Sequence, residues 1–161
     1  MQTGSAHAPH QHDSTLRRVS WAAARQATFH CLTGCAIGEV LGMIIGTSLG
    51  WHDAATVALA VALAFLFGYA LTMRGVLRAG LPFRAAVRVA LAADTVSIAV
   101  MELVDNAVML TVPGAMEAGI GGVVFWASLA GALAVAFVVT LPINRALMSR
   151  GKGHAVVHAL H

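Results

Sequence analysis

Charged residues are scarce in this sequence. Asp, Glu, Lys and Arg make up 11% of its 161 residues, whereas a soluble domain averages about 25%. So few charged side chains cannot cover a water-facing surface, which excludes a soluble globular protein. Only two cysteines are present, which excludes a disulfide-rich secreted scaffold. Hydrophobic residues reach 58%, which excludes disorder over most of the chain. These absences leave an integral membrane protein.

Two motifs that would indicate an enzyme are also missing. The chain has no phosphate-binding loop of the GxxxxGK[ST] type and no HExxH zinc motif, so ATPase and metalloprotease activities have no support. It has no CxxCH sequence either, and covalent haem attachment is therefore not indicated. An enzymatic role is disfavoured on these grounds.

The basic residues indicate how the chain is oriented in a membrane. All ten lie in three clusters: Arg17, Arg18 and Arg25; Arg74, Arg78, Arg84 and Arg88; Arg145, Arg150 and Lys152. The connections 50–54 and 113–118 contain none. Cytoplasmic loops are enriched in Lys and Arg, so both termini and the middle loop are predicted to be cytoplasmic. We interpret the clusters as topology signals and expect no nucleic-acid partner. The predicted location is the bacterial inner membrane, with the lipid bilayer as the partner.

Four apolar stretches are long enough to cross the bilayer as helices. They span residues 27–50, 54–73, 87–112 and 119–143, each near or above the ~20 residues that a crossing helix needs. The predicted fold is therefore an all-α integral membrane protein with four transmembrane helices arranged as two hairpins. Pro142 is expected to kink or end the fourth helix. The predicted divisions are a mobile tail (1–26), the membrane domain (27–147) and a short His-rich cytoplasmic segment (148–161).

The first predicted helix carries a strip of glycines. They recur every four residues, at Gly34, Gly38, Gly42, Gly46 and Gly50. Residues four apart share a face of a helix, and a face without side chains lets another backbone approach closely. The second backbone belongs either to the same chain or to a second copy in a homo-oligomer. A third interpretation is that the open backbone lines a narrow pathway.

Potential metal ligands lie beside the glycine strip. His30 and Cys31 are followed by Cys35 and Glu39, each one helical turn after the last. Two thiols, an imidazole and a carboxylate are ligand types for zinc or copper, and thiolates favour copper(I) among soft metals. The alternative is that both cysteines are small buried apolar residues. A disulfide is disfavoured because the pair is predicted to lie near the reducing cytoplasmic face.

The third predicted helix concentrates acids and thioethers on one face. At 100° per residue, a sector about 100° wide contains five such residues: Asp94, Met101, Glu102, Asp105 and Met109. Carboxyl groups at membrane depth face the protein interior and need a partner or a proton. The predicted spans offer no basic partner unless Arg88 bends inward. A bound cation or protons would neutralise the group, and the alternative is protonated carboxyls hydrogen-bonded between helices.

Three histidines end the chain. His154, His158 and His161 share one face if the segment is helical. They either bind a metal near the cytoplasmic ends of the helices or form a polar interfacial face. Purification-tag residues are a further interpretation, against which the intervening Val and Ala residues argue.

Three motifs together resemble a known family. They are the HCxxGCxxGE stretch from His30 to Glu39, the MELVDN stretch from Met101 to Asn106, and the RGKGH stretch from Arg150 to His154 followed by His158. In these motifs residues 27–161 resemble a family of small bacterial four-helix inner-membrane proteins of unknown function. The resemblance implies the four-helix architecture and gives no activity or assigned site.

The sequence favours a transition-metal binding or transport protein, with copper or zinc as the ion. His30, Cys31, Cys35, His154, His158 and His161 would capture it, and the acids and methionines Glu39, Asp94, Met101, Glu102, Asp105 and Met109 would hold or conduct it. One alternative is a structural subunit that oligomerises through the glycine strip. Another is a haem or redox protein with histidine ligands.

Overall fold

The computed structural model describes residues 20–78, 80, 82–115 and 117–149, and every regular element within them is a helix. The four helices are α1 (Trp21–Ser48), α2 (Asp53–Arg78), α3 (Phe83–Thr111) and α4 (Val123–Ser149). The all-helical fold predicted from the sequence is confirmed. The predicted tail up to residue 19 and the segment from 150 onward, with its three histidines, lie outside the described residues.

Several helix ends lie outside the predicted spans because helices continue past the apolar core, whereas α1 ends at Ser48 and α4 begins at Val123, both inside their predicted spans. α1 begins at Trp21, six residues before its predicted start, where the Ser20 hydroxyl accepts a hydrogen bond from the Ala23 amide. Hydrogen-bonded helix is stable beyond the lipid wherever a cap is present. α4 continues through Pro142 to Ser149, so the expectation that the proline ends this helix is wrong. Broken backbone at that point would leave polar groups unpaired in an apolar surrounding.

Within the described residues, three helices are long and apolar enough to cross a membrane: α1, α2 and α4. The chain also turns large apolar side chains outward, including Leu103, Leu110 and Val123. Such a surface suits lipid rather than water. α3 has 29 residues, but two arginines and three acids lower its apolar character. The location in a membrane therefore agrees with the structure, and the acids of α3 need an explanation.

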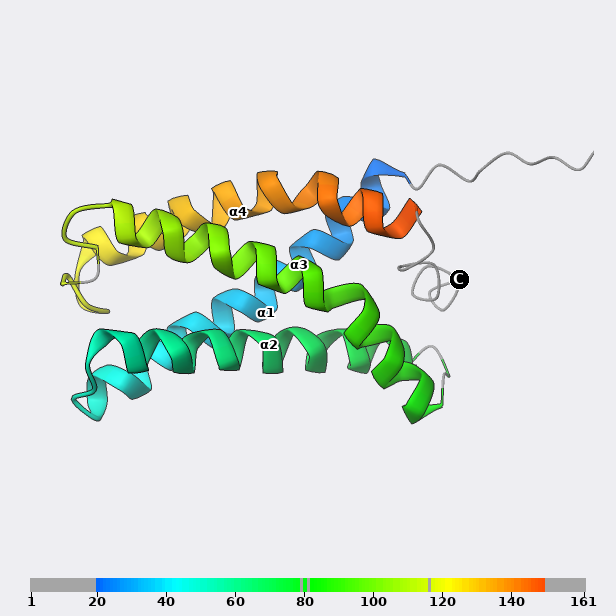
Figure 1. Ribbon diagram of the computed structural model, residues 1–161, viewed down its shortest axis with the longest axis horizontal. Coiled ribbons are helices and arrows are strands. Elements are labelled where there is room, and N and C mark those ends of the chain that lie inside the picture. The colour runs from blue at the N-terminus through cyan, green and yellow to red at the C-terminus, as the bar shows by residue number, and fades with distance from the viewer. Residues whose placement is uncertain (1–19, 79, 81, 116, 150–161) are drawn as a thin grey trace, which may run out of the picture.

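α1 and α3 run along opposite diagonals of the bundle, between α2 and α4 (Figure 1). Both run in the same direction, while α2 and α4 run in the opposite one. The start of α1 and the end of α4 lie at the same end of the bundle (Figure 1), where the Arg145 guanidinium stacks 4.0 Å from the centre of the Trp21 ring. This arrangement brings the first and third helices together inside the molecule.

The glycine strip of α1 packs against α2. A Cβ at Gly34, Gly38, Gly42 or Gly46 would overlap atoms of one small residue of α2, respectively Gly68, Ala64, Ala60 and Thr56. The two helices are antiparallel, so each step of four residues along α1 meets a step of four back along α2. Gly50 departs from the strip: it lies in the turn before α2 with a φ of 64° and open space around it. Only glycine adopts that backbone conformation readily.

A buried hydrogen bond joins α1 to α4 at the end where the described chain starts. The Asn144 side-chain amide donates to the Thr28 hydroxyl at 2.8 Å, and this hydroxyl donates to the Ala24 carbonyl at 2.8 Å. Thr28 and Asn144 are both buried. The pair therefore fixes the position of α4 on α1.

An Asn144→Leu substitution is expected to lower the free energy of unfolding by about 1 kcal/mol, because it keeps the volume but removes an interhelical hydrogen bond. Thermal unfolding of the purified protein in detergent, followed by circular dichroism, measures the change. Ser149→Ala is the matched control, since the Ser149 hydroxyl is exposed and bonds only to Ala146 of its own helix. An unchanged or raised midpoint for Asn144→Leu would contradict the role given to this bond.

Candidate functional site

All four helices contribute to one buried cluster at the centre of the molecule. Its members are Cys31 and Cys35 of α1, Ala64 of α2, Ile98 and Met101 of α3, and Ala136 of α4. α3 buries this face because Ile98, Met101 and Asp105 recur at intervals of three and four residues, which is the period of one helix face. The cluster marks the place where α1 and α3 meet.

The polar groups of α1 and α3 form a series of neighbouring pairs. In chain order the pairs are Cys31 with Ser97, Cys35 with Glu102, and Glu39 with Asp105, and the exposed His30 lies within electrostatic range of Asp94. The order is the same on both helices because they run in the same direction. The Ser97 hydroxyl donates to the Cys31 sulfur at 3.5 Å. The structure thus brings together the acid-bearing face of α3 and the thiol-bearing face of α1.

Three carboxyl groups of this series are deeply buried. Glu39, Glu102 and Asp105 are 6%, 4% and 3% exposed. Both carboxyl oxygens of each glutamate, and Oδ1 of Asp105, are buried without a hydrogen-bond partner. An ionised carboxyl in such a place is strongly disfavoured unless a positive charge accompanies it. Each of these groups therefore needs a proton or a cation to neutralise it.

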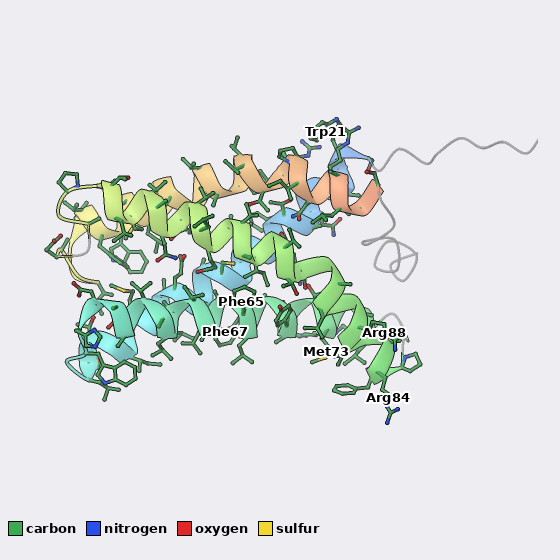
Figure 2. The ribbon with its side chains drawn as sticks, viewed as in Figure 1. Trp21, Phe65, Phe67, Met73, Arg84 and Arg88 are labelled. Carbon is green, nitrogen blue, oxygen red and sulfur yellow. The ribbon has the colours of Figure 1, made fainter. Side chains whose placement is uncertain are left out.

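Basic side chains are far from these acids in the sequence. No Lys, Arg or His occurs at residues 31–51 or 90–144. Arg84 and Arg88 are exposed near the start of α3, at one end of the bundle (Figure 2). Arg88 does not bend inward, so it does not supply the basic partner that the acids of α3 lack. Asp94 is half-buried near the Thr72 hydroxyl, with Oδ2 lacking a hydrogen-bond partner.

The sulfur-bearing residues predicted for the site divide between two places. Cys31, Cys35 and Met101 belong to the central cluster, and both cysteines are free thiols. Met109 lies instead in a second apolar cluster with Phe125, Leu129, Ala115 and Ala132. The predicted site residue Met109 is therefore not among the central sulfur atoms.

The described residues contain no ready-made metal centre. No three of their His, Cys, Asp and Glu side chains converge closely enough to hold a metal ion. His30 is exposed, so it lies at the margin of the series rather than within it. The histidines at 154, 158 and 161 lie outside the described residues. The structure offers donors in successive pairs instead of one assembled ligand set.

Two buried hydroxyl residues were not predicted as part of the site. Ser97 contacts Cys31, and Thr140 of α4 is fully buried with its hydroxyl oxygen lacking a partner. Thr140 shares a helix face with Ala136 of the central cluster and with Asn144, each one turn away. In the sequence both are single hydroxyl residues in apolar stretches, a weak signal, because such residues commonly bond to their own helix.

Residues 46–50 match the letters of the GxSxG nucleophile motif of hydrolases. That motif acts at a strand-to-helix turn that exposes the serine. Here the segment ends α1, and the Ser48 hydroxyl donates to the Ile44 carbonyl of the same helix at 2.6 Å. The structural context of a hydrolase is therefore absent from this part of the chain.

No curated protein and no solved structure is similar to the chain at a significant level. A family model does match, over residues 20–153, and its description is domain of unknown function, DUF4396. The match takes in all four helices together with the paired donors of α1 and α3. It assigns no activity to them. The chain belongs to the DUF4396 family.

Proposed function

We propose that the chain binds a transition-metal cation, copper or zinc, between α1 and α3 and moves it across the bilayer. The observation that supports this most directly is the burial of Glu39, Glu102 and Asp105 with carboxyl oxygens that lack partners. Groups that cost stability and have no structural partner are typical of ion pathways inside membrane proteins.

The proposal includes α3 as a fourth membrane-spanning helix. Its length matches that of the three apolar helices, and its acids face inward while Leu103 and Leu110 face outward. The basic clusters favour a cytoplasmic position for the start of α1 and the end of α4. In this orientation Cys31 lies nearer the cytoplasm and Glu39 deeper in the membrane.

The spacing of the donors favours a moving ion over a stored one. From Cys31 to Glu39 the series extends about 12 Å along α1, at 1.5 Å per residue. Each position along this series offers two or three donors. These are enough to hold an ion briefly but too few for the four-coordinate shell of structural zinc. Passage from pair to pair therefore fits this geometry better than permanent binding.

Proton movement is the second candidate function. It is favoured by the absence, among the described side chains, of three His, Cys, Asp or Glu groups that converge on one point. Glu39 and Asp105 are neighbouring carboxyls, and two such groups can share and pass on a proton. Parallel flux measurements with a metal-sensitive and a pH-sensitive dye separate protons from metal ions.

A structural subunit and a haem protein gain less support from the geometry. The glycine strip packs on α2 of the same chain, so a subunit that assembles with further copies would use another surface. His30 is exposed on α1 and gives no sign of a haem pocket. Neither function explains why carboxyl groups lie buried between α1 and α3.

Purified protein in lipid vesicles is expected to carry copper or zinc inward along an imposed gradient, measured with a metal-sensitive dye inside the vesicle. An Asp105→Asn variant is expected to reduce this flux about tenfold, because a neutral amide cannot compensate a cation. Glu117→Gln is the matched control, since Glu117 is an exposed acid in the loop before α4.

Two outcomes would reject the metal proposal. One is wild-type metal flux no higher than that of empty vesicles. The other is equal flux for the wild type and Asp105→Asn. A pH-sensitive dye is loaded in parallel vesicles, and a proton flux that depends on Asp105 without any metal flux would establish the second candidate in its place.

A further inference from the structure

Three sulfur-bearing side chains belong to the buried cluster at the centre of the bundle. Cys31 and Cys35 face α3 one helical turn apart, and each is at most 5% exposed. Met101 of α3 belongs to the same cluster and is fully buried. Both thiols are free, and the Cys35 thiol is a neighbour of the Cys31 thiol. Two thiols and a thioether therefore belong to one buried cluster.

The neighbours of these side chains are mainly apolar. Ala64, Ile98 and Ala136, from three helices, belong to the same cluster. The Ser97 hydroxyl donates to the Cys31 sulfur, and the Glu102 carboxyl lies next to Cys35. A ligand held here is recognised by sulfur and has little access to water.

We propose that Cys31, Cys35 and Met101 form a binding site selective for a soft monovalent cation of the copper(I) class over zinc(II). The role of that ion as cargo rests on the proposed function, whereas the binding site stands on the sulfur cluster alone. Thiolate and thioether ligands select copper(I), while zinc takes four ligands in a tetrahedron and does not use thioethers.

The charge balance of the site leads to the same choice. When copper(I) binds Cys35, the sulfur–hydrogen bond breaks, a copper–sulfur bond forms, and the thiol proton is released to water. The assembly of copper(I), one thiolate, one thiol and one thioether then has no net charge. Zinc(II) with the same groups would keep one positive charge, and a buried net charge is costly. A second proton would have to leave the site before zinc(II) could be held there without net charge.

Silver(I) is the probe for this site, because it is a soft monovalent ion that does not change its oxidation state under the assay conditions. Equilibrium dialysis of the full-length protein in detergent, followed by elemental analysis, is expected to find about one bound silver ion per chain that depends on the cysteines. A Cys31→Ser/Cys35→Ser double variant is expected to bind silver about 100-fold more weakly at this site, and Met101→Leu about tenfold more weakly.

Met109→Leu is the matched control, since Met109 is also a buried methionine of α3 but lies in the other cluster. Its silver affinity is expected to equal that of the wild type. Zinc binding that depends on the cysteines is expected to be about 100-fold weaker than silver binding. Circular dichroism of each variant verifies that it is folded, and if the double variant does not fold, the comparison of Met101→Leu with Met109→Leu decides the matter.

Three results would overturn the site. They are silver binding that survives the double serine variant, equal silver affinity for Met101→Leu and Met109→Leu, and cysteine-dependent zinc binding as tight as that of silver. These outcomes differ from a failure of the proposed function. Cysteine-dependent silver binding without any Asp105-dependent flux would keep the site and remove the transport role, and the reverse result would keep the transport role and remove the site.

Discussion

A Gly38→Leu substitution is expected to prevent the bundle from folding. A Cβ at Gly38 would overlap the backbone of Ala64, and a backbone cannot move aside as the end of a flexible side chain can. Overpacking a close-packed interior costs about 1–3 kcal/mol, and more where backbone must shift. The measurement is the yield of monodisperse protein after detergent extraction, together with its thermal midpoint.

Gly131→Leu is the matched control for this experiment. Gly131 lies in α4 with open space where its Cβ would be, so its replacement is expected to leave yield and midpoint unchanged. A Gly38→Leu variant that purifies normally and unfolds at the wild-type temperature would show that α1 and α2 are not in contact at this level.

A Glu39→Met substitution is expected to change stability and flux in opposite directions. Methionine fills a similar volume without the two carboxyl oxygens that lack partners. Removing such buried groups is expected to raise the free energy of unfolding by about 1–3 kcal/mol. If Glu39 belongs to the pathway, metal flux into vesicles is expected to fall about tenfold in the same variant.

Thermal unfolding and vesicle flux of the same preparation test both expectations. Glu117→Gln again serves as control, because removing an exposed charge changes neither quantity. A Glu39→Met variant that is less stable than the wild type would show that the carboxyl has a structural partner. A more stable variant with full flux would show that the pathway does not use Glu39.

The buried face of α3 could be predicted from the sequence, but the helix that packs against this face could not. Asp94, Met101, Glu102 and Asp105 share one sector by helical geometry alone, and lipid excludes acids from the outer surface. Which helix lies opposite depends on how two hairpins pack, and the short loops fix only the pairing within each hairpin. The proximity of Cys35 and Glu102 therefore becomes visible only in the structure.

The glycine strip is a second case in which the sequence does not identify the packing partner. Its spacing indicates close packing, but it cannot distinguish a helix of the same chain from one of a second copy. The decisive feature is the row of small residues on α2, at Thr56, Ala60, Ala64 and Gly68. This row does not stand out in the sequence, because alanine is common throughout the apolar stretches. The spacing predicts that Gly50 belongs to the strip, but its position is set by the turn before α2.

The fit between α1 and α2 has a mechanical consequence. Because each glycine of α1 rests on its own small residue of α2, a slide of one helix along the other by less than a full turn would drive side chains into backbone. The α1–α2 hairpin is therefore expected to move as one rigid unit. A motion of α1 away from α3 would therefore carry α2 with it.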